Sequence, residues 1–395
     1  MKNSVMIQSR DLTGITKNGD GNIAIKKTYH VFASFILVIF ILAGCSEEAS
    51  YKVKVNGNDV IVCEVEKVTD TIAVQLSSLV ESYNMVILEN STEALIGTAW
   101  HTVVTDDYIA INGRNQVPVK LFGTDGRFLG EIGTVGRGPG EYIILNGIQF
   151  SYKGDMLNLL PFGNTNKIMV YDIWGNHVMD IPLAYTQRKF KASFLKDSVI
   201  TIFSMPFETD SVICYQQDYH GKVLGRVDVP DYLINYSFDG EVFSNLNDNN
   251  DFFNTATDTL YNYDVKSNNI VPRFTKDFGG MKAITLSYEI PEYFYFYYNI
   301  YSGPSQRGNI LVNKKTLESN YFKIENNFFG GIEMTNYFNN GWFINNVDAF
   351  TLKNKIKTAL ENNDMDESMR KKLVELDNSL EEGDNNIVFY GKLKK

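Results

Sequence analysis

Cysteine is scarce in this 395-residue chain, and its three residues exclude a scaffold held together by disulfides. Proline, with nine residues, is too rare for a proline-rich linker protein. Basic charge is also low, because 37 Lys and Arg stand against 47 Asp and Glu and leave a net charge of −10. That balance argues against a nucleic-acid partner. No apolar run reaches the roughly 20 residues of a membrane span, which excludes a polytopic membrane protein.

What the chain does contain is apolar and aromatic. Hydrophobic residues make up 44% and aromatic residues 13%, with 23 Tyr and 26 Phe. This composition excludes a disordered chain and a coiled coil, and it favours strands. The length allows two or three domains, or one large all-β domain.

The first forty-five residues have the layout of a secretory signal. Lys26 and Lys27 precede an apolar run at 31–42, and the sequence Leu-Ala-Gly-Cys that ends at Cys45 resembles a bacterial lipobox. We therefore expect residues 1–44 to be a signal peptide, with translation starting nearer Lys26, and Cys45 to be lipidated. Residues 45–50 then form a lipidated linker. An uncleaved anchor or a buried helix is the alternative.

Ser46-Glu47-Glu48 resembles the acidic export signal of Bacteroidetes lipoproteins. The resemblance implies an outer-membrane lipoprotein displayed on the cell surface, with the lipid as its only membrane contact. A plain solvated linker, which leaves the protein facing the periplasm, is the other interpretation.

A repeat of 46 to 49 residues runs through the chain. Each unit has an apolar strand, a small polar residue, a turn and a second apolar strand. Glycine at turn positions tolerates positive φ, and an aspartate before the turn can bond to backbone N–H groups two residues on. The five anchor positions of the repeat are Gly123, Asp172, Asp218, Asp264 and Asn313.

About four strands fit into each period, which is typical of propeller blades. A linear β-solenoid is the rival. Five units, plus one composite unit of Trp342-Phe343-Ile344 with N-terminal strands between Tyr51 and Trp100, predict an all-β, six-bladed β-propeller of four-stranded blades at 51–395. Five or seven blades would fit nearly as well. Apolar residues at helical spacing predict a C-terminal helical hairpin at about 348–382, packed across one face or presented to a partner.

Ile132 to Tyr142, with Gly154-Asp155 and Asn166-Lys167-Ile168 after it, resembles the blade sequence of NHL-like propellers. More closely, residues 51–395 resemble the six-bladed β-propeller lipoproteins of gut Bacteroides. Asn385-Asn386 departs from the family's usual Asn-Pro. The resemblance implies a propeller on an outer-membrane lipid anchor and no settled activity.

Residues for catalysis, phosphate binding or metal binding are harder to identify. The glycine-rich run 133–140 is no phosphate loop, because Pro139 removes a donor, Glu141 adds negative charge and a strand follows. It is a tight connection between blades, from which Arg137 and Glu141 could point into the central funnel. The three histidines after the signal, His101, His177 and His220, assemble no metal site, and no nucleophile elbow occurs. We expect no cofactor and no catalysis.

Tyr293-Phe294-Tyr295-Phe296-Tyr297-Tyr298 is the most unusual segment. As a strand it places Tyr293, Tyr295 and Tyr297 on one side, where they could contact a sugar or peptide, and the phenylalanines on the other. Burial of both sides between blades is the plainer interpretation. Overall the sequence predicts a non-catalytic binding module for a protein or peptide of the cell envelope. Glycan or small-solute binding in nutrient uptake is one alternative, and a metal-dependent lyase or hydrolase in the channel is another.

Overall fold

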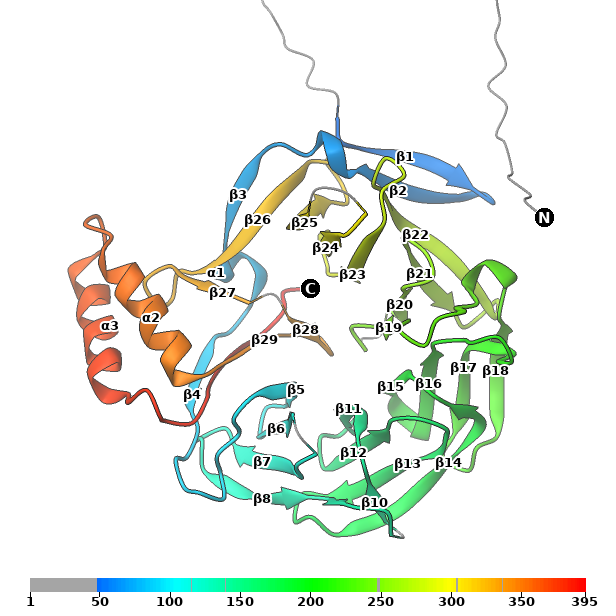
Figure 1. The fold of residues 1–395 in the computed structure, drawn as a ribbon, viewed down its shortest axis with the longest axis horizontal. Helices are drawn as coiled ribbons and strands as arrows, with labels where there is room; N and C mark the ends of the chain where they lie inside the picture. Colours follow the sequence, from blue (N-terminus) through cyan, green and yellow to red (C-terminus); the bar gives the residue numbers. More distant parts are fainter. Residues whose placement is uncertain (1–47, 115, 139, 247–248, 303–304, 336) are drawn as a thin grey trace, which may run out of the picture. The chain divides into compact units, whose positions relative to one another are not determined.

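Six sheets, each with four strands at its centre, stand around one axis in this computed structural model (Figure 1). The structure describes residues 48–395 except 115, 139, 247–248, 303–304 and 336. The predicted all-β, six-bladed propeller is confirmed.

Blades one to three follow each other along the chain. Blade one contains β5 (Ala99–Val104), β6 (Tyr108–Gly113), β7 (Val119–Gly123) and β8 (Phe128–Ile132). Blade two contains β11 (Leu145–Phe150), β12 (Met156–Pro161), β13 (Thr165–Asp172) and β14 (His177–Gln187). Blade three contains β15 (Phe190–Phe194), β16 (Val199–Ser204), β17 (Val212–Asp218) and β18 (Val223–Asp228).

Blades four and five continue the ring, and blade six closes it. Blade four contains β19 (Val242–Phe243), β20 (Asp251–Asn254), β21 (Thr259–Asp264) and β22 (Asn269–Asp277). Blade five contains β23 (Ala283–Glu289), β24 (Tyr293–Ile300), β25 (Gln306–Asn313) and β26 (Ser319–Asn326), with β27 (Ile332–Met334) added. Blade six contains β28 (Phe338–Asn339), β29 (Trp342–Val347), β30 (Ile387–Lys392) and β4 (Asn84–Ile87) from the N-terminal part, as the predicted composite blade requires.

The repeat anchors all occupy one structural position. Each is the last residue of the third strand in its blade, just before the turn into the fourth strand. Asp172 Oδ1 accepts hydrogen bonds from the N–H groups of Trp174 and Asn176, and Asp218 Oδ1 accepts from those of His220 and Lys222. The bracing role predicted for these carboxylates is confirmed.

The N-terminal segment 50–87, here called the outer strap, runs along the outer edges of three successive blades. It begins with a hairpin of β1 (Ser50–Val55) and β2 (Asn58–Glu64), and β2 pairs in parallel with β22 of blade four. Next, β3 (Thr71–Gln75) pairs in parallel with β26 of blade five, and β4 pairs antiparallel with β30 of blade six. Ring closure is thus shared among three blades.

The tyrosine-rich segment forms β24, the second strand of blade five. Its phenylalanines, with Tyr298, lie in the core shared with blade four, as predicted. Tyr295, on the opposite side, lies in the core shared with blade six, where Tyr293 and Tyr297 also pack. Cys63 and Cys214 are free and buried.

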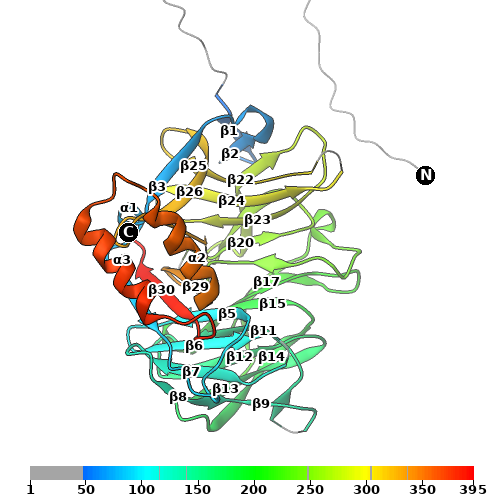
Figure 2. The same cartoon turned by 60° about the vertical axis from the view of Figure 1, so that its left-hand side comes forward.

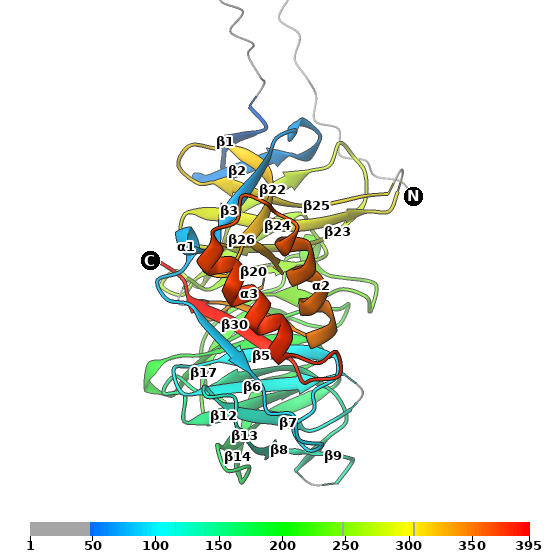
Figure 3. The same ribbon diagram turned by 90° about the vertical axis from the view of Figure 1, so that its left-hand side faces the viewer.

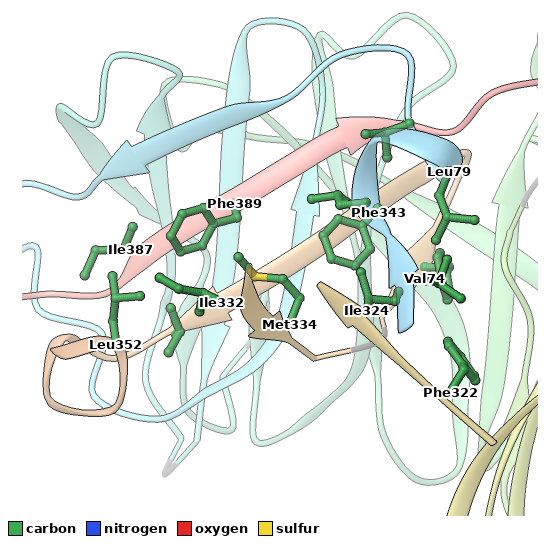
Figure 4. Packing of buried hydrophobic residues seen from close by; sticks show 14 of the residues in the cluster. Val74, Leu79, Phe322, Ile324, Ile332, Met334, Phe343, Leu352, Ile387 and Phe389 are labelled. Atoms are coloured by element: carbon green, nitrogen blue, oxygen red, sulfur yellow. The ribbon is translucent and has the colours of Figure 1, made fainter. Parts of the chain in front are cut away.

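The predicted helical hairpin is present as α2 (Ala349–Leu360) and α3 (Glu367–Ser379), inserted between β29 and β30. Asp348 and Asp366 cap their N-termini. The hairpin lies at the outer rim beside blades five and six, rather than across a face of the propeller (Figures 2 and 3). Leu352 joins the cluster that contains Ile387, Phe389 and Met334 (Figure 4). Neither helix is long and apolar enough to cross a membrane, and the same holds for the other helices among the described residues.

Candidate functional site

The inner strands enclose a cavity of about 230 Å³ at the propeller axis, and all six blades contribute to its wall. We call it the channel site. At about 30 Å³ for each water molecule, it has room for roughly eight waters, which is the scale of a single sugar ring. Its lining includes Trp100, His101, Gly147, Lys191, Ser244, Leu246, Tyr288, Tyr337 and Asn339.

β-Bulges distort two inner strands at the site. The pairing register of β5 shifts between Ala99 and His101, and that of β11 shifts between Leu145 and Gly147. A bulge adds a residue and turns side chains out of regular alternation. As a result Trp100 and His101, although adjacent in sequence, both line the cavity, with their rings stacked at a centroid distance of 5.8 Å.

Trp100 is the exposed aromatic residue of the channel site, with 56% of its surface accessible. Its ring also borders a second cavity of about 230 Å³ between blades one and two, beside Arg114 and Ile143. The channel and this neighbouring cavity therefore share one ring, which can cover a ligand that enters either of them.

His101 is neutral at physiological pH. Burial, and then the charge of Lys191, lowers the pKa of the imidazole to about 3. Its Nδ1 lies 3.3 Å from Asn112 Oδ1. A neutral imidazole offers both a donor and an acceptor, so His101 can bond to uncharged hydroxyl groups.

Lys191 supplies the positive charge of the channel site. Its Nζ donates to the carbonyl oxygen of Asn146, the bulged residue of β11, at 2.9 Å. Burial lowers the pKa of the ammonium to about 8, against an opposing effect of Glu241. Because that value lies above neutrality, Lys191 is mostly protonated at pH 7.

Segment 244–246, which follows β19, contributes Ser244 and Leu246 to the wall of the channel site. Its Asn245 accepts a hydrogen bond from Asn340 N–H of blade six at 2.5 Å and donates to the Glu289 carbonyl of blade five. The Ser193 hydroxyl of blade three donates to the carbonyl of Leu246. Contacts to three other blades hold this segment in place.

Phe238, on the loop 229–241 between blades three and four, belongs to an aromatic group. Phe238 packs against Phe162 and Phe207 at ring-centroid distances of 5.9 and 5.3 Å. Lys189 fixes the loop, since its Nζ donates to the carbonyls of Phe238 and Gly240 and pairs with Glu241 at 2.5 Å. The ammonium of Lys189 is therefore bonded to the loop, whereas Lys191 lines the cavity.

Arg137 and Glu141, singled out from the glycine-rich run, lie away from this site. They belong to the loop that joins β9 (Thr134–Val135) to β10 (Glu141–Tyr142), at the outer edge of the ring at the bottom of Figure 1. Glu141 Oε2 accepts the N–H of Gly138 at 2.7 Å, within that same loop. The structure gives Glu141 a role in the shape of the loop.

Tyr293, Tyr295 and Tyr297 are not part of the channel site either. Tyr295 is 3% exposed, and its hydroxyl donates to Asn309 Oδ1 at 3.0 Å. The structure thus follows the plainer interpretation, in which both sides of the strand pack between blades. Cys45 lies outside the described residues.

A larger cavity of about 730 Å³ lies next to Trp342 and the C-terminal residues 392–395. Two of its lysines are already bonded, because Lys392 contacts Asp106 at 2.6 Å and Lys394 Nζ donates to the carbonyl of Ser77. Among the described residues, no group of three His, Cys, Asp or Glu side chains could hold a metal ion.

Sequence reasoning missed Trp100 and Lys191 because neither belongs to a motif. Blades one and three each contribute one of them near the start of the inner strand. Unusual residues at that position of successive repeats are the signal that could have pointed to them.

Comparison with known proteins places the fold and leaves the activity open. The family model described as a domain of unknown function, DUF4934, matches residues 59–392. No curated protein matches the chain. The crystal structure of a Bacteroides fragilis protein described as exported is 16% identical, with a TM-score of 0.55, and the match covers 82% of this chain and 100% of that one.

Two more crystal structures are more distant. A DUF4221 family member from Bacteroides vulgatus is 12% identical, with a TM-score of 0.45, and 80% of this chain and 98% of that one are covered. An auxiliary nutrient binding protein from Bacteroides thetaiotaomicron is 9% identical, with a TM-score of 0.36, and 69% and 71% are covered. At 16% identity, the likeness to the Bacteroides fragilis structure concerns the fold alone.

Proposed function

Because the chain belongs to the DUF4934 family, whose description assigns no activity, we propose a function from its geometry. The protein is a non-catalytic binding module that takes a sugar-sized polar solute into the channel site. It serves solute capture at the cell envelope, the role that the sequence analysis held as its first alternative.

The observation that carries this proposal is the position of Trp100 at the channel. Aromatic rings with one face open bind the apolar face of a sugar ring, and small-ligand sites combine such rings with a few polar groups. Here the polar groups are His101, Lys191 and Asn339. The cavity volume of about 230 Å³ fits one ring better than a folded partner.

Absence of catalysis is part of the proposal. General acid–base chemistry uses groups with pKa values near the working pH. His101, with its pKa of about 3, does not change protonation near neutrality. The pKa of Lys191, about 8, lies closer to that range, and we propose that its ammonium holds charge against a ligand rather than transferring a proton.

A protein or peptide partner, the first expectation from the sequence, remains the second candidate. The observation that favours it is the loop 229–241, where Tyr232, Tyr236 and Phe238 are 60%, 75% and 54% exposed. Exposed aromatic residues on one loop are typical of interaction surfaces. Phe238→Ala would then weaken partner binding without changing solute binding.

We further propose that the protein is exported and held by lipid on Cys45 at the outer membrane, and that its blades are of the NHL-like type. The lipobox resemblance at 42–45 supports lipidation. The first strand begins at Ser50, only five residues after Cys45, so the propeller would stay close to the membrane surface.

Calorimetric titration of the full chain in detergent with glucose, galactose, glucuronate and galacturonate tests solute binding. Trp100→Ala should weaken binding of any sugar that binds the wild type. Trp174→Ala is the matched control, because Trp174 is 79% exposed on an outer turn far along the blade from the axis. Absence of binding by all four sugars, or equal losses in both variants, would contradict the proposal.

A further inference from the structure

Lys191 differs from the buried lysines Lys189 and Lys276 in what surrounds its ammonium group. Lys189 has two carbonyls and the Glu241 carboxylate, and Lys276 has the hydroxyls of Thr285 and Ser287. Within the part of the chain that the structure describes, Lys191 makes a single hydrogen bond, to Asn146, and no ion pair.

This single bond leaves the charge of Lys191 under-compensated. An ammonium group has three N–H donors, so two remain for a ligand in the cavity that it lines. Removing a charge from water without a partner is costly. Glu241, the nearest influence of opposite sign, is bound to Lys189 at 2.5 Å. The charge of Lys191 is therefore left available for a ligand in the cavity.

The neighbours of Lys191 are arranged for a ligand with both a charge and a ring. Trp100 offers an aromatic face, and His101 offers neutral hydrogen-bonding groups from the same strand. The bulge at Asn146 turns a backbone carbonyl toward Nζ and fixes the position of the ammonium. These groups come from three different inner strands, β5, β11 and β15, and come together only in the channel site.

We propose that the solute taken by the channel site is an acidic sugar, whose carboxylate pairs with Lys191 while its ring lies against Trp100. The inference rests on the proposed function and names the ligand class. Carboxylate and ammonium form a charge-assisted hydrogen bond, which is stronger in a partly buried cavity than at an exposed surface.

Two matched pairs of sugars test the charge requirement. Glucuronate differs from glucose, and galacturonate from galactose, only in carrying a carboxylate in place of a primary alcohol. Titration calorimetry of the full chain should show at least one acid binding about tenfold tighter than its neutral partner, as expected for one charged hydrogen bond. Acetate, the carboxylate alone, should bind far more weakly.

Variants of Lys191 assign the effect to this residue. Lys191→Met keeps most of the chain length without the charge, and should bring the acid and its neutral partner to similar affinities. Lys191→Arg should retain the preference for the acid, which separates loss of charge from loss of folding. Lys222→Met, on an outer turn, is the matched control and should behave as the wild type.

The outcomes separate this inference from the proposed function. Equal affinity for acidic and neutral sugars in the wild type would overturn the acidic ligand and leave sugar binding intact. Acetate binding as tightly as the uronates would reduce the site to one for small anions and overturn the sugar. Failure of all sugars to bind would overturn both proposals. If Lys191→Met still prefers the acidic sugar over its neutral partner, the carboxylate binds somewhere other than Lys191.

Discussion

Gly175, in the outer turn of blade two, lies against the backbone carbonyl of Glu131 on the outer strand of blade one. A Cβ atom on Gly175 would come within 2.8 Å of that oxygen. The same relation recurs between Gly221 of blade three and Pro182 of blade two, at 3.1 Å, and Gly126 likewise contacts Ile87. The repeat glycines therefore serve both the turn and the packing of each blade on the one before it.

Gly126→Ala should destabilise the protein by more than a change in backbone preference alone. Gly126 has φ of +86°, and an added methyl group would collide with the Ile87 carbonyl. We expect a loss of more than about 1 kcal/mol, the usual scale for a residue with Cβ at positive φ. Urea unfolding of Gly126→Ala and the wild type measures this loss of stability.

Gly57→Ala is the control for that experiment. Gly57 has φ of +83°, and nothing lies within 4 Å of its added Cβ. The loss of stability in Gly57→Ala should therefore reflect the positive φ only. If the two variants unfold at the same urea concentration, the close approach of blades at this turn does not contribute to stability.

The anchor carboxylates give a second stability prediction. Asp172→Ala should cost at most about 1 kcal/mol, because the lost hydrogen bonds are exposed to water. Asp218→Ala should act in the same direction. Hydrogen bonds from the Lys222 and His220 backbone lower the pKa of Asp218, so its contribution is present at neutral pH and is lost as the pH falls through that lowered value.

Thermal unfolding at pH 7 and pH 3 checks this dependence. The difference between the wild type and Asp218→Ala should shrink at the lower pH. Melting temperatures that match the wild type in both Asp variants at pH 7 would show that the turns hold without their carboxylates.

The repeat and the blades could be predicted from the sequence because the information that specifies them is local. Each anchor, such as Asp172, sits next to its own turn, and each turn joins neighbouring strands. The composite sixth blade was also predicted, since closing a ring of five units demands a partner from the other end of the chain.

Local sequence patterns could not predict the outer strap or the channel site. β2 and β3 pair in parallel with strands more than two hundred residues away, and no spacing in the sequence marks such pairing. Trp100 and Lys191 meet because ring formation brings blades one and three to one axis. The glycine-rich run drew attention to Arg137 and Glu141, yet its unusual composition reflects the shape of a loop at the rim.

The outer strap should be essential to the stability of the ring. Leu76, which follows β3, is fully buried in the cluster between blades five and six. Leu76→Ala should cost about 2–5 kcal/mol, the range for removing a buried leucine side chain. Ile72→Ala is the control in the same strap, because Ile72 is 39% exposed and should cost far less. Urea unfolding of both variants makes the comparison, and equal small losses would mean that the strap is dispensable.

Cys45→Ala tests the membrane anchor. If the cysteine is lipidated, the variant should leave the membrane fraction and appear in soluble form, because a signal without lipid leaves no permanent anchor. Fractionation followed by immunoblotting provides the measurement, with Cys63→Ala as the control thiol because Cys63 is buried. A Cys45→Ala variant that stays with the membrane would contradict the anchor.

The ammonium of Lys191 predicts how stability responds to alkaline pH. In the folded protein its pKa is about 8, because burial disfavours the charge, whereas an unfolded lysine titrates at about 10.4. Between these values the unfolded chain binds more protons, so the contribution of this site to stability rises with pH. His101 is already neutral there, and burial holds its pKa at about 3.

The variant Lys191→Met lacks this titrating group. Urea unfolding at pH 7 and pH 9.5 should therefore show the wild type gaining stability relative to Lys191→Met. A difference that stays constant with pH would mean that the ammonium is not desolvated, and an anionic ligand would then have little reason to bind there. Conversely, a ligand that pairs with Lys191 should raise its pKa and remove much of that gain, because the charge would no longer be costly in the folded state.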